Sequence, residues 1–284
     1  MKMKSVIRTK TYYCGKNDLE IDLFLWMEVE KRYTRKKKEK VTIPKQKVLN
    51  DKRAKRTFCQ LVKTNFGEGD LHLTLTYNAK YLPEKVEDAE KEVRNYLRRV
   101  ARLRKKKNLP PLKYIFITEQ GVQSKRIHHH VIINGGLSRD EVELLWRRPK
   151  RKGQQQGEAL GDCNADRLRT DDKGLERLAS YLAKDPKGRK RWTPSQNLKK
   201  PEVSTSDTKT SRRKFMQLVL LPEDAEEVRQ HFEKQHPDFA VTEVRKEWND
   251  ITCTWAVYVK LHRKTEKRDN NAYRTAFRKC KAAL

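Results

Sequence analysis

Glu119, His128 and His130 have the residue types and spacing of a catalytic metal site. Side chains alternate across a β-strand, so His128 and His130 point to one face of a strand that contains both. If this strand pairs in a hairpin that sets Glu119 opposite His128, the three side chains converge on one face. One oxygen and two nitrogen ligands with open positions suit a divalent cation that takes part in catalysis. The alternative interpretation, a basic hairpin with surface histidines, does not explain the matching parity of Glu119.

The surrounding residues predict the two strands that would position this cluster. Lys113–Glu119 and Ile127–Ile133 are rich in isoleucine, valine and aromatic residues, a composition typical of strands. The polar loop Gln120–Arg126 between them contains a glycine and is expected to form the turn. His129 falls on the opposite face of its strand, where we expect it to pack against helices as a structural residue.

The flanking sequence predicts elements in the order β-α-β-β-α-β. Asp70–Tyr77 alternates apolar and polar residues, Val86–Lys107 carries a helical apolar stripe, and Ser138 begins a capping-box pattern. Asp162–Arg169 supplies a fourth strand. This order is typical of a ferredoxin-like (split βαβ) antiparallel sheet with helices on one face. The predicted fold class is therefore α+β, with extra N- and C-terminal elements and an open sheet face for a ligand.

A helix predicted over Gly174–Lys184 carries a candidate nucleophile. Tyr181 lies at the edge of the apolar stripe of this helix, and Lys184 follows it three residues later. Such a tyrosine is most often a packing residue. A tyrosine hydroxyl, with an ordinary pKa of about 10, would need a nearby metal or ammonium group to ionise and attack a phosphate.

The charge of the chain indicates a polyanionic partner. Lys and Arg number 67 against 38 Asp and Glu, a net charge of +29, which favours nucleic acid first and an anionic membrane second. No apolar run reaches the roughly 18 residues of a membrane span, and Met1–Lys10 lacks the hydrophobic region of a signal peptide. Five scattered cysteines without a CxxC pair are typical of reduced thiols in a cytoplasmic protein.

Composition and pattern divide the chain into three predicted regions. Residues 1–65 are interpreted as a basic N-terminal extension and residues 66–200 as the catalytic domain. Residues 201–284 are interpreted as a small α+β region with a basic tail.

Three motifs together resemble those of the HUH endonucleases, and within them the rolling-circle replication initiator (Rep) proteins of bacterial plasmids and phages. The motifs are LTLTY (73–77), Glu119 with His128-His129-His130, and Tyr181-Leu-Ala-Lys184. The stretches LNDKRAKRTFCQLVKTNFGEGD before the first strand and SQNLKKP after the helix are also similar, so the resemblance covers about residues 49–201.

This resemblance implies a site and a reaction. Glu119, His128 and His130 would hold a divalent metal ion, Mg or Mn, while Tyr181 would be the nucleophile and Lys184 its helper. The enzyme would nick single-stranded DNA at a replication origin, leaving a 5′-phosphotyrosine link and a free 3′ hydroxyl. A single tyrosine in the motif favours an initiator with one nucleophile.

The same resemblance suggests further contacts and partners. Thr74, Thr76, Lys125 and Arg126 are the candidate DNA-binding residues, and His72 is a spare metal-ligand candidate on the face of the two threonines. The chain lacks a GxxxxGK[ST] signature, so unwinding is expected to come from a host helicase, with a host polymerase extending the 3′ end, in the bacterial cytoplasm.

Two other classes of function remain open at this point. A relaxase or a transposase would use the same chemistry on another substrate. A non-catalytic protein could grip single-stranded nucleic acid on a basic ferredoxin-like sheet, but that mode needs exposed aromatic residues on the sheet face. A basic structural protein would explain the charge and leave the Glu/His parity unexplained.

Overall fold

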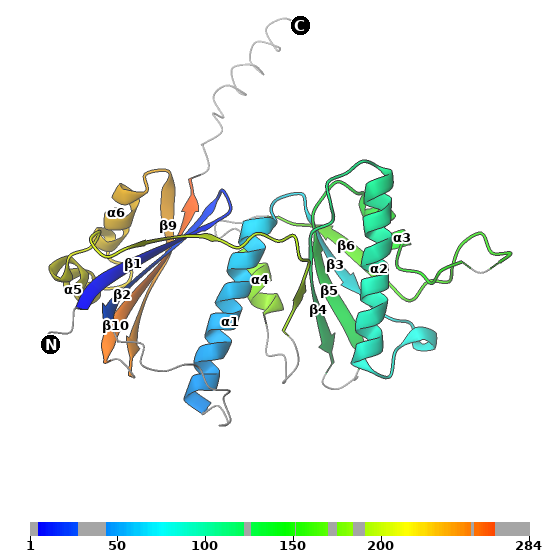
Figure 1. Cartoon of the computed structure of the whole chain (residues 1–284), viewed down its shortest axis with the longest axis horizontal. Helices are drawn as coiled ribbons and strands as arrows, with labels where there is room; N and C mark the ends of the chain where they lie inside the picture. The colour runs from blue at the N-terminus through cyan, green and yellow to red at the C-terminus, as the bar shows by residue number, and fades with distance from the viewer. Residues whose placement is uncertain are drawn as a thin grey trace, which may run out of the picture. The chain divides into compact units, whose positions relative to one another are not determined.

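The chain folds into two compact units, each built around its own five-stranded sheet (Figure 1). In this computed structural model the described residues are 5–27, 44–121, 126–150, 152–169, 175–183, 191–250 and 253–264. The two units are described one after the other. The predicted α+β fold class is confirmed in both.

The first unit to consider contains the histidines, and its sheet has the strand order β6-β3-β5-β4-β7 with antiparallel pairs. The β-α-β-β-α-β order along the chain is as predicted, and the spatial order of its four main strands is that of a split βαβ sheet. Its strands are β3 (Leu71–Leu75), β4 (Tyr114–Gln120), β5 (Ile127–Ile133), β6 (Cys163–Arg167) and β7 (Thr193–Pro194). Its helices are α1 (Pro44–Asn65), α2 (Val86–Lys106), α3 (Arg139–Leu144) and α4 (Glu176–Leu182), with a 3₁₀ turn at Ala79–Tyr81.

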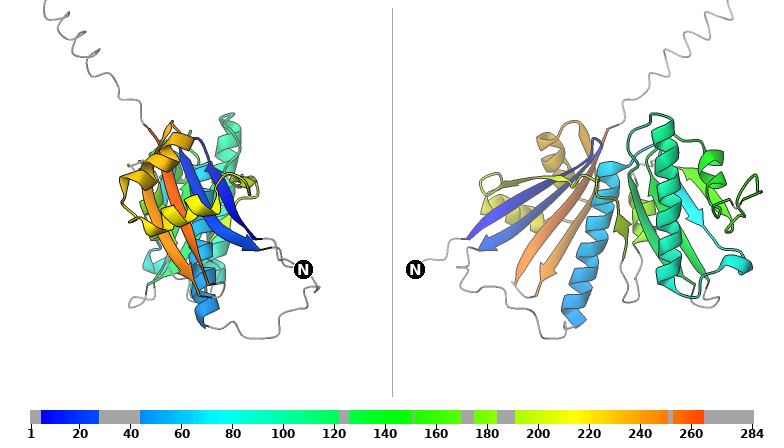
Figure 2. Two further views of the ribbon diagram at one scale, coloured as in Figure 1. Left: turned by 90° about the vertical axis from the view of Figure 1, so that its left-hand side faces the viewer. Right: turned by 45° about the vertical axis from the view of Figure 1, so that its right-hand side comes forward.

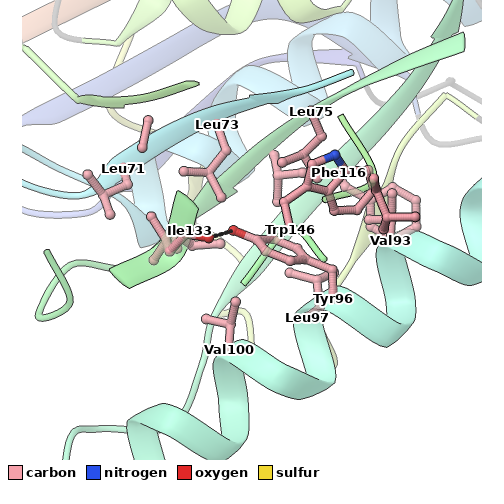
Figure 3. Close-up of a cluster of buried hydrophobic side chains, with 14 of the residues drawn as sticks. Leu71, Leu73, Leu75, Val93, Tyr96, Leu97, Val100, Phe116, Ile133 and Trp146 are labelled. Carbon is pink, nitrogen blue, oxygen red and sulfur yellow. Dashed lines mark hydrogen bonds between the residues drawn. The ribbon is translucent and has the colours of Figure 1, made fainter. Parts of the chain in front are cut away.

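One face of this sheet is covered by α2 and the residues after α3 (Figure 3). The apolar stripe of α2 packs on side chains that alternate along three strands, as the sequence predicts. Ser138 and Glu141 form the predicted capping box at the start of α3. The labelled members of this core are Leu71, Leu73, Leu75, Val93, Tyr96, Leu97, Val100, Phe116, Ile133 and Trp146.

The opposite face is more covered than the sequence suggested. Ile115, Ile117 and Ile132 point to that face and are buried against α1 and α4. Isoleucines in these positions need an apolar partner, because leaving them in water forgoes roughly 1.5–3 kcal/mol per side chain. A buried ion pair of 2.6 Å between Lys63 Nζ and Glu176 Oε2 joins the two helices. The face predicted to be open is therefore open over only part of its area.

The second unit joins the N-terminal strands to the C-terminal region. Its sheet has the order β8-β1-β2-β10-β9, and β2 pairs with β10 although more than two hundred residues separate them in the chain. Helices α5 and α6 pack on one face of this sheet (Figure 2). The predicted α+β elements after residue 201 are present. The elements are β1 (Ser5–Cys14), β2 (Asp18–Met27), β8 (Glu202–Ser206), α5 (Arg212–Leu220), α6 (Glu226–Gln235), β9 (Phe239–Asn249) and β10 (Thr254–Arg263).

The compact units group the chain by contacts. One comprises 1–12, 16–29 and 203–284, and the other 13–15 and 30–202. Helix α1 thus belongs with the histidine-bearing sheet, and β1 and β2 belong with the C-terminal elements. The predicted boundaries near residues 65 and 200 concern separate functional domains and stay a prediction. Among the described residues, no helix is long and apolar enough to cross a membrane.

Trp146 anchors the core under α2, and its removal tests the importance of that core. Its side chain is 1% exposed, its Nε1 donates to the Thr76 carbonyl at 2.8 Å, and its ring meets Tyr77 and Tyr96 edge-on. We expect Trp146→Ala to lower the free energy of unfolding by about 3–5 kcal/mol, measured by urea denaturation. Leu144→Ala, at a 53% exposed position of α3, is the matched control. Equal stability losses in the two variants would contradict this account.

Candidate metal and nucleophile site

The pairing of β4 with β5 sets the geometry of the site. Glu119 pairs with His128 and Ile117 with His130, while Thr74 of β3 pairs with His130 from the other side. Directly paired residues share a face, so this register places Glu119, His128, His130 and Thr74 together. The register predicted from the sequence is confirmed.

The three candidate ligands are close enough to share one cation. Single ligand atoms of Glu119, His128 and His130 all lie within 4.8 Å of one another, and His128 Nε2 is 3.4 Å from Glu119 Oε2. Glu119 Oε1 is shielded from solvent and has no hydrogen-bond partner among the described residues. A buried carboxylate oxygen without a donor is costly. A cation at this position would satisfy it, so the residues present fit a divalent metal ion.

Tyr181 lies beside this cluster on α4. Its side chain is 52% exposed, and its ring centroid is 6.0 Å from that of His130, in an edge-on arrangement. An exposed phenol next to two imidazoles and a carboxylate is accessible to an incoming strand. Lys184, the predicted helper, and Lys125, a predicted DNA contact, lie outside the described residues.

His129 points to the other face of β5 and is completely buried. Its Nε2 lies 3.0 Å from Tyr77 Oη and its Nδ1 lies 2.9 Å from Thr118 Oγ1. Since the Tyr77 hydroxyl donates its hydrogen to the Ala89 carbonyl, His129 Nε2 carries the proton and Nδ1 accepts from Thr118. Burial, helped by the neighbouring His128 and His130, lowers the pKa of His129 to about 3. The prediction that His129 is a structural residue of the helical side is confirmed.

His72 contacts a candidate ligand and lies outside the cluster itself. Its Nε2 is 3.3 Å from His130 Nδ1, and the two rings stack with centroids 5.3 Å apart. Burial lowers the pKa of His72, against an opposing effect of Asp166. The metal-type cluster found among the described residues contains Glu119, His128 and His130 without His72. A hydrogen bond to Nδ1 of a ligating histidine orients its ring and leaves Nε2 for the metal.

The remaining predicted DNA contacts divide into two kinds. Thr74 lies on the site face beside His130. The Thr76 hydroxyl instead exchanges hydrogen bonds with the backbone of Asp162, at 3.2 and 3.3 Å, and Arg126 Nη2 donates to the Tyr77 carbonyl at 2.6 Å. In this structure Thr76 and Arg126 hold strand ends together, so Thr74 is the threonine placed to meet a ligand.

The ferredoxin-like sheet and this cluster together define a candidate phosphate-processing site on an α+β fold. Residues 70–186 match a family model whose description is that of a replication-associated protein of the ORF2 type. The match spans β3 to α4 and hence every candidate residue of the site, although it covers less than half of the chain. It is consistent with a Rep-type replication initiator. Neither the curated proteins nor the solved structures gave a match.

The buried neutral His129 predicts acid sensitivity of the metal-free protein. The folded state holds its pKa near 3, whereas the unfolded chain has an ordinary value of about 6.5. The unfolded state therefore binds more protons between these values, and the free energy of unfolding falls as the pH drops from about 6.5 toward 3. We expect His129→Leu to be less stable at pH 7 but to lose less further stability on acidification, measured by urea denaturation in chelator. Identical pH slopes for both proteins would contradict this.

The proposed ligands can be tested by metal binding alone. We expect Glu119→Gln and His128→Ala to weaken Mn²⁺ binding at least roughly tenfold, since each removes an atom from the coordination set, measured by calorimetry. His231→Ala changes a histidine on α6 that bonds Gln235 and serves as control. Unchanged Mn²⁺ affinity in both site variants would place the metal elsewhere.

Proposed function

We propose that this protein is a metal-dependent DNA nickase and strand transferase of the HUH type that initiates rolling-circle replication. The observation that carries the proposal is the convergence of Glu119, His128 and His130 with an exposed Tyr181 whose ring is 6.0 Å from that of His130. The match to a replication-associated family over the same residues supports it. The net charge of +29 is suited to a DNA substrate.

The roles of the residues follow from their chemistry. A divalent cation, Mg or Mn, held by Glu119, His128 and His130 would polarise the scissile phosphate and neutralise charge in the transition state. His72, through its contact with His130 Nδ1, would orient that ligand ring. Thr74, on the same face, would donate its hydroxyl hydrogen to a phosphate oxygen of the strand.

Tyr181 would act as the nucleophile. Its Oη attacks phosphorus, so that an Oη–P bond forms while the bond from phosphorus to the 3′ oxygen breaks. The phenol loses its proton, and the leaving 3′ oxygen gains one and becomes the free 3′ hydroxyl. The 5′ phosphate stays linked to the protein. Because one phosphodiester replaces another, the bond energy is kept for later rejoining. Lys184 would assist ionisation of the phenol.

A non-catalytic single-strand binding protein is the second candidate. That function relies on aromatic side chains displayed on the sheet for base stacking. In the described part of the histidine-bearing sheet, the site face carries Glu119, Thr74 and the imidazoles where such aromatics would be needed. A relaxase or transposase uses the proposed chemistry as well, and the substrate strand distinguishes it from an initiator.

The covalent intermediate gives the decisive test. Labelled single-stranded fragments from the protein's own replicon are incubated with Mn²⁺ or Mg²⁺ and analysed on denaturing gels. We expect a metal-dependent protein–DNA adduct with the wild type and none with Tyr181→Phe, because only the phenol oxygen can form the link. The change removes one oxygen from a half-exposed side chain, so folding and DNA binding are expected to persist.

Tyr13→Phe, at another exposed tyrosine, is the control and should form as much adduct as the wild type. Adduct formation by Tyr181→Phe would show that another residue is the nucleophile. Tight, salt-sensitive binding without any adduct across the replicon would favour the binding protein instead. An adduct that forms only on a conjugative transfer origin or a transposon end would favour the relaxase or transposase.

A further inference from the structure

A cavity of about 680 Å³ lies at the edge of the histidine-bearing sheet, next to the proposed site. It is formed where β6 meets α3 and α4, and none of the three candidate metal ligands lines it. Its volume lies within the range of about 300–1,000 Å³ common for small-ligand sites. The lining residues are His72, Arg139, Asp166, Arg167, Leu168, Arg169 and Leu178.

The cavity adjoins both chemical groups of the site. His72 lines it and lies 3.3 Å from His130 Nδ1. Leu178 also lines it and stands three residues before Tyr181 on α4, so the two side chains are neighbours on one side of that helix. A single strand that passes over the metal ligands and Tyr181 can therefore place its next nucleotide in this cavity.

The lining combines cations with an apolar floor. Three arginines face one aspartate: Arg139 lies 3.7 Å from Asp166, and Arg167 donates to the Gly69 carbonyl at 2.8 Å. Guanidinium groups bind phosphate oxygens in pairs and also stack on planar bases. Leu168 is 3% exposed, and Leu178 packs against the same core. A charged rim over leucine side chains suits a group that is anionic at one end and flat and weakly polar at the other.

We infer that this cavity binds one nucleotide of the single-stranded substrate, adjacent to the scissile phosphate. Its base would lie against Leu168 and Leu178, and its phosphate would contact Arg139 and Arg167. The inference rests on the proposed function, because it takes the substrate to be single-stranded DNA. It adds a subsite that fixes which phosphate faces Tyr181, since holding the neighbouring nucleotide sets the register of the strand.

The test couples the cavity to one position of the DNA. A series of oligonucleotides carries a single abasic site that moves stepwise around the cleaved phosphate. Binding is measured by fluorescence anisotropy in chelator, where no cleavage occurs. At one position adjacent to the scissile phosphate, removing the base should weaken wild-type binding roughly fivefold or more, the usual loss for a stacked base. With Arg139→Gln/Arg167→Gln, the same lesion should change affinity less than about twofold, because the contact is already lost.

The matched control is Arg98→Gln/Arg102→Gln, which removes two arginines from α2 and the same amount of charge. Its abasic profile should match that of the wild type even where its overall affinity is lower. If the cavity variant keeps the full wild-type penalty at every position, the cavity does not hold a nucleotide. This outcome is separate from failure of the proposed chemistry, which would appear as an absent adduct with strand binding intact. In that case the oligonucleotides are centred on the tightest-binding site.

Discussion

The register between β4 and β5 is the constraint on which the site depends. Because the side-chain period of a strand is two, a slip of one residue would move His128 and His130 to the face packed against α2. The observed pairing of Glu119 with His128 brings a carboxylate and two imidazoles together. A metal cluster of this kind needs no loop of special conformation. It needs two strands that cannot slide.

His129 helps to prevent that sliding. It is completely buried, and both of its ring nitrogens are engaged, by Tyr77 and Thr118. Shifting β5 by one residue would break these hydrogen bonds and leave buried polar groups unpaired, at a cost of about 1–3 kcal/mol each. The central histidine of the three therefore selects the register in which its neighbours reach the opposite face. Its depressed pKa is the electrostatic consequence of that burial.

Sequence reasoning succeeded where a local pattern determines the structure and was incomplete where distant segments decide it. Alternation in 127–133 and 71–75 gave the strands, their facing and the Glu/His convergence. The strand 18–27 was missed because its partner, 254–263, lies at the other end of the chain. Helix α1 was hidden within a strongly basic region, so its packing on the site face was not predicted. The lining of the edge cavity escaped notice because its arginines come from separate elements.

Helix α4 shows how the covered and open parts of the site face work together. Leu182 is 2% exposed and packs into the core, whereas the adjacent Tyr181 is 52% exposed. A helix of seven residues is not stable by itself, so α4 owes its position to the core that it shares with α1 and to the ion pair between Lys63 and Glu176. Displacing a reacting group by about 1 Å can cost a hundredfold in rate. The apolar cover over part of the sheet is thus the support that fixes the proposed nucleophile beside His130, while the uncovered part admits the strand.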